Sequence, residues 1–156
     1  MKWNTSNAVS LVALAAFVLP AATFAQENGR PSKADELMIA AQKICPVSGQ
    51  DLRAMGGPVK AKSGQTTIFL CCKGCLGKPV SKENRAKVTA NLIAAQGRCP
   101  VMNRPLPKDA TSTVANGRTI FVCCPPCTKK IQADPAKYVA TVDGLLRENL
   151  TQPATR

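Results

Sequence analysis

Eight cysteines are the residues of this chain best suited to do chemistry, since the sequence holds no histidine and few carboxylates. They form two sets with the same pattern, one of Cys45, Cys71, Cys72 and Cys75 and the other of Cys99, Cys123, Cys124 and Cys127. One remote sulfur and three neighbouring ones suit a soft metal ion in tetrahedral coordination. The sequence therefore predicts two metal sites, with all eight cysteines as candidate ligands.

Each set contains two adjacent cysteines that compete for one place. Consecutive side chains on a strand point to opposite faces. We therefore expect either Cys71 or Cys72 to lie outside the coordination shell, and likewise either Cys123 or Cys124. The last cysteine of each set follows where the chain is expected to turn into a helix. There the helix dipole and free backbone N–H groups favour the thiolate.

The cysteines belong to a larger internal repeat. Ile39-Ala40-Ala41-Gln42 precedes a Cys-Pro-Val turn, and the same pattern returns 54 residues later, at Ile93 to Gln96. The run Thr67 to Cys75 returns 52 residues later as Thr119 to Cys127. We interpret the chain as one module written twice: a helix, a Cys-Pro-Val turn, a hairpin, Cys-Cys-x-x-Cys, and the helix that opens the next copy.

This repeat predicts the division of the chain. We expect a flexible lead and the start of the first helix at residues 26–38, metal-binding units at 39–92 and 93–150, and a tail at 151–156. Three helices would then serve the two units.

Local signals predict the elements that must position the cysteines. Ser32 and Asp35 match a capping box at the start of the first helix. Asn116-Gly117 between two β-rich runs predicts a hairpin turn, and Gly64-Gln65 takes the same place in the first copy. Asp134-Pro135 predicts the N-cap and first residue of the last helix.

Residues 1–25 have the features of a signal peptide. Lys2 is followed by an apolar run from Ala8 to Leu19, and Thr23-Phe24-Ala25 offers small residues for cleavage. The run is shorter than the about 20 residues that a membrane span needs. We expect cleavage after Ala25, a periplasmic or secreted protein, and no stable membrane insertion afterwards.

Removing this segment leaves a chain with few large side chains. Its aromatic residues would be Phe69, Phe121 and Tyr138, and we expect both phenylalanines to pack the hairpins on the helices. Cores this thin usually need a metal or disulfides. The formal charge of +12 would fall by one, to +11, with the loss of Lys2. The basic residues are scattered and stacking aromatics are scarce, so we expect no nucleic-acid partner.

Two other uses of the cysteines stay open. Export favours disulfides, and eight cysteines could form four. The spacing of Cys72 and Cys75, and of Cys124 and Cys127, is that of thiol–disulfide oxidoreductases, although neither unit has room for their βαβ frame.

Hydrolytic metal chemistry is disfavoured, because four sulfurs close the coordination sphere. We therefore expect a metal-binding protein that is not an enzyme, with Zn²⁺ as the first ion and Cu⁺ as the second. A thiol–disulfide oxidoreductase, or a structural adaptor stapled by zinc or disulfides, is the alternative.

The second copy resembles the YHS and TRASH-like group of small heavy-metal-binding domains. The resemblance rests on a hairpin ending in Phe-Cys (Asn116 to Cys123), a further cysteine four positions on (Cys127), and the helix entry Asp134-Pro135-Ala136-Lys137-Tyr138. The first copy matches more loosely, from Cys45 to Val88. That family usually carries a cysteine after Pro-Val, where this chain has Ser48 and Met102.

The resemblance implies an α+β fold of two tandem, small, treble-clef-like units behind the signal peptide. It also implies a role in metal sensing, trafficking or resistance. The partners it suggests, besides the metal ion, are a metal transporter or another envelope protein.

Overall fold

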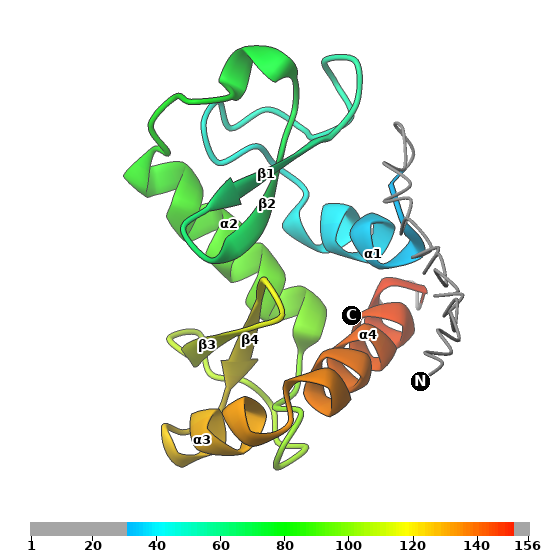
Figure 1. Cartoon of the computed structure of the whole chain (residues 1–156), viewed down its shortest axis with the longest axis vertical. Coiled ribbons are helices and arrows are strands. Elements are labelled where there is room, and N and C mark those ends of the chain that lie inside the picture. Colours follow the sequence, from blue (N-terminus) through cyan, green and yellow to red (C-terminus); the bar gives the residue numbers. More distant parts are fainter. Residues whose placement is uncertain (1–30, 152–156) are drawn as a thin grey trace, which may run out of the picture. The chain divides into compact units, whose positions relative to one another are not determined.

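Helices and two-stranded hairpins alternate along residues 31–151, the part of the chain that the computed structural model describes. In order, the elements are α1 (Lys33–Gln42), β1 (Val59–Ser63), β2 (Thr66–Leu70), the 3₁₀ helix η1 (Lys73–Cys75), α2 (Lys82–Gln96), β3 (Thr111–Ala115), β4 (Arg118–Val122), α3 (Pro126–Ala133) and α4 (Pro135–Thr151) (Figure 1). The predicted α+β class is confirmed for this part of the chain, as four α-helices and two antiparallel hairpins.

The predicted signal peptide at residues 1–25 lies outside the described residues, as do residues 26–30 and the tail from 152 onward. Among the helices of residues 31–151, none combines the length and the apolar character needed to cross a bilayer.

Both predicted hairpins are present. Strands β1 and β2 pair from Val59–Leu70 to Ser63–Thr66, and β3 and β4 pair from Thr111–Val122 to Ala115–Arg118. Asn116 and Gly117 adopt φ angles of 48° and 76°, the left-handed conformations that a two-residue turn between strands requires. The two hairpins also meet: the Thr67 N–H donates to the Gly117 carbonyl at 2.6 Å.

Helices α1, α2 and α4 contact one another pairwise. Asn91 of α2 donates to the Gln42 carbonyl at the end of α1, at 3.1 Å, and Asn149 of α4 donates to the Gln96 carbonyl at the end of α2, also at 3.1 Å. The exposed carbonyls at a helix C-terminus need such partners. Each helix is therefore closed by the next one in this group. The expected boundary between residues 92 and 93 falls inside α2 and stays a prediction.

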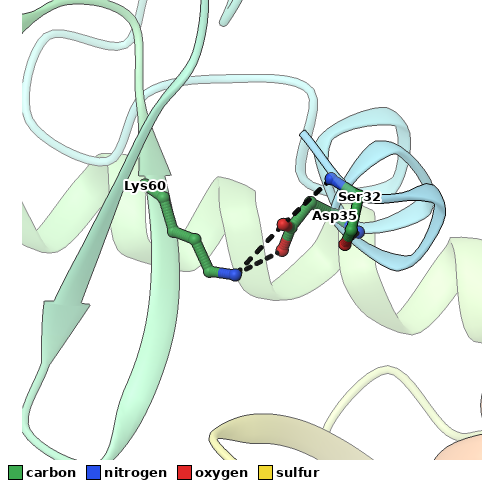
Figure 2. A network of polar contacts seen from close by, with 3 residues as sticks. All are labelled: Ser32, Asp35 and Lys60. Atoms are coloured by element: carbon green, nitrogen blue, oxygen red, sulfur yellow. Dashed lines mark hydrogen bonds and ion pairs between the residues drawn. The ribbon is translucent and has the colours of Figure 1, made fainter. Parts of the chain in front are cut away.

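The start of α1 is tied to the first hairpin (Figure 2). Ser32 and Asp35 form the predicted capping box, with bonds of 3.1 and 3.2 Å, and Lys60 of β1 reaches the Asp35 carboxylate at 2.9 Å. Burial opposes the charge on Asp35, yet the hydrogen bonds from Lys60 and Ser32 outweigh it and lower the pKa of Asp35 below 3.8. The carboxylate thus caps a helix and anchors a strand at once.

The two copies differ after the last cysteine of each set. In the second copy Pro125-Pro126 opens α3, where proline fits the first helical turn. In the first copy the chain makes only η1, because Gly77 takes a φ of 73° and Pro79 cannot continue a helix. A short fourth α-helix therefore joins the three that the repeat predicted.

Each cysteine set lies in its own hydrophobic cluster. The first cluster contains Cys45, Cys71 and Cys75 with Ile39, Leu52, Phe69 and Leu70. The second contains Cys99 and Cys127 with Ala41, Ala95, Ala115, Ile120, Val122, Ile131, Val142 and Leu146. Helix α1 contributes to both. Phe69 and Phe121 are buried as predicted, at 2% and 4% exposed.

Candidate metal centres

Three sulfurs from separate segments converge in the first copy. Cys45 follows α1, Cys71 directly follows β2 and Cys75 ends η1. Their sulfur atoms all lie within 4.8 Å of one another, and all three residues are buried. The remote cysteine that the spacing predicted is therefore brought to the local pair.

The second copy assembles the equivalent group. Cys99 follows α2, Cys123 directly follows β4 and Cys127 lies in α3, and their sulfurs again all lie within 4.8 Å of one another. Cys99 and Cys127 are buried, whereas Cys123 is partly exposed. In this copy the helix expected after the cluster does carry the last cysteine.

A tight loop presents Cys45. The Cys45 N–H donates to the Gln50 carbonyl at 2.7 Å, and the Gly49 N–H donates back to the Cys45 carbonyl at 2.8 Å. Gly49 has a φ of 75°, which a residue without Cβ adopts freely. The chain thereby turns back at once, and the Cys45 sulfur faces the end of β2.

The same loop presents Cys99. Its N–H donates to the Arg104 carbonyl at 2.8 Å, and the Asn103 N–H donates to the Cys99 carbonyl at 2.8 Å. Asn103 takes the place of Gly49 with a φ of 53°, a conformation that asparagine tolerates better than most residues. The two loops are therefore equivalent although their sequences differ after Pro-Val.

A buried glutamine in each copy fixes the distance between this loop and the hairpin. The Gln42 amide donates to the carbonyls of Ile44 at 2.9 Å and Phe69 at 2.7 Å, and its oxygen accepts the Phe69 N–H at 3.0 Å. Gln96 makes the matching bonds to Arg98 and Phe121, at 2.9, 2.7 and 3.0 Å.

Sequence reasoning missed the role of these glutamines. The signal was present, because Gln42 and Gln96 end the repeated Ile-Ala-Ala-Gln motif. A polar residue repeated beside apolar ones indicates a buried hydrogen-bonding role, since buried polar groups need partners. Only the fold shows that its partner is the residue two positions before Cys71 or Cys123.

The fourth cysteine of each set lies at the edge of its group. The Cys72 sulfur is 4.0 Å from those of both Cys71 and Cys75, which are themselves 3.7 Å apart. Cys72 is partly exposed and does not belong to the three mutually close sulfurs. Adjacent cysteines do occupy different places, as the sequence predicted, and the more exposed place falls to Cys72.

In the second copy the edge sulfur is closer to the last cysteine. The Cys124 sulfur lies 3.2 Å from that of Cys127 and 3.9 Å from that of Cys123. Cys124 is partly exposed. All eight cysteines are free thiols, since these separations exceed the about 2.05 Å of a disulfide.

The sulfurs of the first copy have different acidities. Burial opposes the Cys45 thiolate, but the backbone N–H and hydroxyl of Ser48 and the N–H of Cys71 outweigh it, and they lower the pKa of Cys45 to about 6. Burial, followed by contact with the Cys71 and Cys45 sulfurs, raises the pKa of Cys75 to about 12. The Gly74 N–H lowers the pKa of Cys72. Cys45 is thus the ready thiolate of this group.

The second copy repeats this arrangement. Burial opposes the Cys99 thiolate, yet the backbone N–H groups of Cys123 and Met102 outweigh it and lower the pKa of Cys99. Burial raises the pKa of Cys123, and it raises that of Cys127 to about 12. The hydrogen bond with Cys127 lowers the pKa of Cys124. The loop cysteine is therefore the more acidic buried thiol in both copies.

The residue after Pro-Val differs between the two sites. The Ser48 hydroxyl lies 3.3 Å from the Cys71 sulfur. Met102 replaces it in the second copy and is 47% exposed. A hydroxyl that contacts a ligand sulfur can hold that ligand in place, whereas an exposed thioether adds only a soft sulfur near the rim. The two sites therefore have different surroundings.

The sulfur spacing fits a thiolate-bound metal. Zn–S bonds of about 2.3 Å in a tetrahedron put the sulfurs about 3.8 Å apart. The separations of 3.7 and 4.0 Å in the first copy come close to that value. Both groups can hold a metal ion, as cysteine-rich metal-binding modules do. Thiolates suit both Zn²⁺ and Cu⁺, so the donor set leaves both ions open.

Comparisons of this chain with models of protein families, with curated proteins and with solved structures find no match.

Proposed function

We propose that this protein is an exported heavy-metal-binding protein with two thiolate sites, which binds Zn²⁺, or Cu⁺ as the second choice. One observation carries the proposal: in each copy, three cysteines from separate segments bring their sulfurs within 4.8 Å of one another in a mostly buried position. A chain has little reason to gather three thiols in this way twice unless an ion joins them.

The fourth cysteine gives each site a means of exchange. Cys72 and Cys124 are partly exposed and lie next to the buried sulfurs. In this proposal three mostly buried cysteines hold the ion and the edge cysteine completes its coordination, but it can also leave to admit another ligand. Such a site suits trafficking or sequestration better than permanent structural binding.

The resemblance to YHS and TRASH-like domains supports the same conclusion. It favours treble-clef-like units that work beside a metal transporter or another envelope protein. Export through residues 1–25, cleavage after Ala25, a periplasmic or secreted location and the absence of enzymatic activity belong to this proposal. The apolar run from Ala8 to Leu19 and the small residues that end at Ala25 support export.

Metal analysis of protein isolated from its native compartment tests the proposal. We expect two ions per chain, one in a Cys45→Ser variant, one in a Cys99→Ser variant and none in the double variant. Ser112→Ala, an exposed change in β3, should leave two. Protein that carries no metal and no free thiols would refute metal binding and favour a disulfide framework.

A second candidate function is thiol–disulfide exchange, favoured by the 3.2 Å contact between the Cys124 and Cys127 sulfurs. Cys124 is partly exposed with a lowered pKa, whereas Cys127 is buried with a pKa of about 12. The Cys124 thiolate would attack a substrate disulfide and release one thiolate. Cys127 would then lose its proton, displace the second substrate thiol and leave a Cys124–Cys127 disulfide for an external thiol to reduce.

This candidate makes its own prediction. A Cys127→Ser variant would accumulate a mixed disulfide through Cys124 when mixed with a model disulfide, and the reduced wild type would turn that disulfide over. A metal site predicts neither result, so one assay separates the two functions.

A further inference from the structure

The two copies are built alike up to their last cysteine and then differ over one face of the hairpin. In the second copy α3 follows, and Ile131 from this helix is fully buried. It packs with Ile120 and Val122 of β4, and Ile120 is only 1% exposed. Figure 1 shows α3 beside this hairpin. A short helix therefore seals this face of the second copy.

The first copy has no such helix. The repeat offset of 52 residues places Pro79 where Ile131 stands, and the chain from Leu76 to Ser81 runs as a loop to α2. Ile68, the counterpart of Ile120, is only partly buried, and Leu76 is 48% exposed. The face that α3 covers in one copy is therefore open in the other.

A hollow of about 340 Å³ lies at this open face. Its apolar lining includes Val47, Ile68, Leu70, Leu76 and Val80, and the sulfur-bearing Cys75 also borders it. The volume is ample for a branched aliphatic side chain such as the one that Ile131 supplies in the second copy. The hollow therefore adjoins the first metal site directly.

The charged residues that line the hollow are Lys62 and Lys78, both exposed, and no carboxylate lies among its lining residues. Lys62 replaces Val114 of the second copy, so the rim is basic only where the face is open. Opposite charges around an apolar centre favour docking and set its orientation. The chemistry selects a partner that is apolar at its centre and acidic at its edges.

We propose that this hollow is a docking site for an amphipathic, acidic helix of a partner protein, which takes the place that α3 takes in the second copy. An aliphatic side chain of that helix fills the space between Ile68 and Leu76, and its carboxylates pair with Lys62 and Lys78. Helix-in-groove recognition of this kind reads apolar anchors on one face. The docked helix lies beside Cys75, so the partner's function in metal transfer rests on the function proposed above.

A peptide copied from α3 tests the proposal. The probe is residues 125–134 with Lys129→Glu, Lys130→Glu and Cys127→Ser, which keeps Ile131 and gives acidic flanks. In ¹⁵N-labelled protein we expect a saturable shift of the Ile68, Leu76 and Val80 amide signals. The matching peptide with native lysines should bind at least 10-fold more weakly. A Leu76→Glu variant should lose binding, whereas Val114→Glu, an exposed change in the other hairpin, should keep it.

Charge reversal makes the test stricter. A Lys62→Glu, Lys78→Glu variant should prefer the lysine peptide over the acidic one. Equal binding of both peptides, or shifts outside the hollow, would overturn the proposal. A concentration-dependent dimer that Leu76→Glu abolishes in sedimentation would instead assign the face to a second copy of the chain. Zinc stoichiometry of Leu76→Glu, measured in parallel, shows separately whether the metal site itself has failed.

Discussion

At the scale of single residues, Gln42 and Gln96 determine where the sulfurs meet. Each is buried and links the loop before its first cysteine to both backbone polar groups of a strand residue. A buried donor or acceptor that loses its partner costs about 1–3 kcal/mol. These side chains therefore position the metal ligands and also stabilise the fold.

A Gln42→Ala variant should lower the free energy of unfolding by about 2–4 kcal/mol, because the Phe69 N–H and carbonyl lose their side-chain partner. Urea unfolding measures this change. Gln65→Ala, in the exposed turn between β1 and β2, serves as the control and should change stability by less than about 0.5 kcal/mol. Equal effects of the two variants would contradict the role assigned to Gln42.

The acidity of the loop cysteines predicts a pH dependence for the metal-free protein. The folded pKa of Cys45, about 6, lies below its ordinary 9.0, so this thiol stabilises the fold fully above pH 9 and loses that contribution as the pH falls through 6. Cys75, raised to about 12, acts in the opposite sense, with a contribution that is full below pH 9 and lost as the pH rises to 12.

Stability of the reduced, metal-free protein should therefore rise as the pH increases from about 6 toward 9, between the folded and ordinary pKa of Cys45. Urea unfolding in the presence of a chelator and a reductant measures the rise. A Cys45→Ser variant should show a shallower slope, because it lacks the thiol that ionises in the fold. An unchanged slope in this variant would show that Cys45 is not acidic.

At the scale of elements, an unusual turn joins each helix to its cysteine loop. The N–H of Ile44 donates to the Gln42 carbonyl, and that of Arg98 donates to the Gln96 carbonyl, at 2.8 and 2.7 Å. The residue between them has a positive φ, 64° at Lys43 and 67° at Gly97. Three-residue turns of this hand are strained for residues with a side chain. The first copy therefore carries strain that the second avoids with glycine.

Lys43→Gly should stabilise the protein by about 0.5–1 kcal/mol, since glycine adopts this φ without steric cost. Gly97→Ala should destabilise it by more, because a Cβ there would also approach the Asn149 amide to 2.9 Å. Thermal unfolding of the two variants checks the opposite signs. Lys33→Gly, at the first residue of α1, is the contrasting control and should not stabilise.

Most elements could be predicted from local signals. The capping box at Ser32, the Asn116-Gly117 turn and the Asp134-Pro135 helix start each have a mechanism that acts within a few residues. The different fates of the chain after Cys75 and Cys127 were harder to foresee. They depend on Gly77 and Pro79 in one copy and on the packing of Ile131 in the other.

The candidate sites were predictable in membership but not in rank. Counting and spacing gathered the right sulfurs, and strand alternation predicted that one of each adjacent pair would be set apart. Which one depends on three-dimensional packing, because Cys71 and Cys123 directly follow strands whose register is fixed by the hairpins. The partnership of Gln42 with Phe69 spans 27 residues and has no local signature.

At the scale of the whole molecule, the two metal sites share structural support. Helix α1 supplies Ile39 to the first cluster and Ala41 to the second, and Thr67 of one hairpin bonds to Gly117 of the other. An ion bound in either site therefore stabilises a unit that includes the other. Binding that occurs only in the folded state raises stability in proportion to the logarithm of ligand excess.

Zinc at about 100 times its dissociation constant should raise the free energy of unfolding by about 2.7 kcal/mol for each occupied site. Calorimetry with and without a chelator measures the increment. Cys45→Ser and Cys99→Ser should each retain about half of it. A single variant that loses the whole increment would show that the sites bind only together.

The contact between α1 and α4 limits how many copies this architecture accepts. In open repeat proteins each unit touches only its neighbours, so further units can be added without disturbing the rest. Here the first and last helices pack on each other as well as on α2. A third copy inserted after α2 would have to separate them and uncover the apolar surfaces they share. The duplication is thus a closed pair, complete at two.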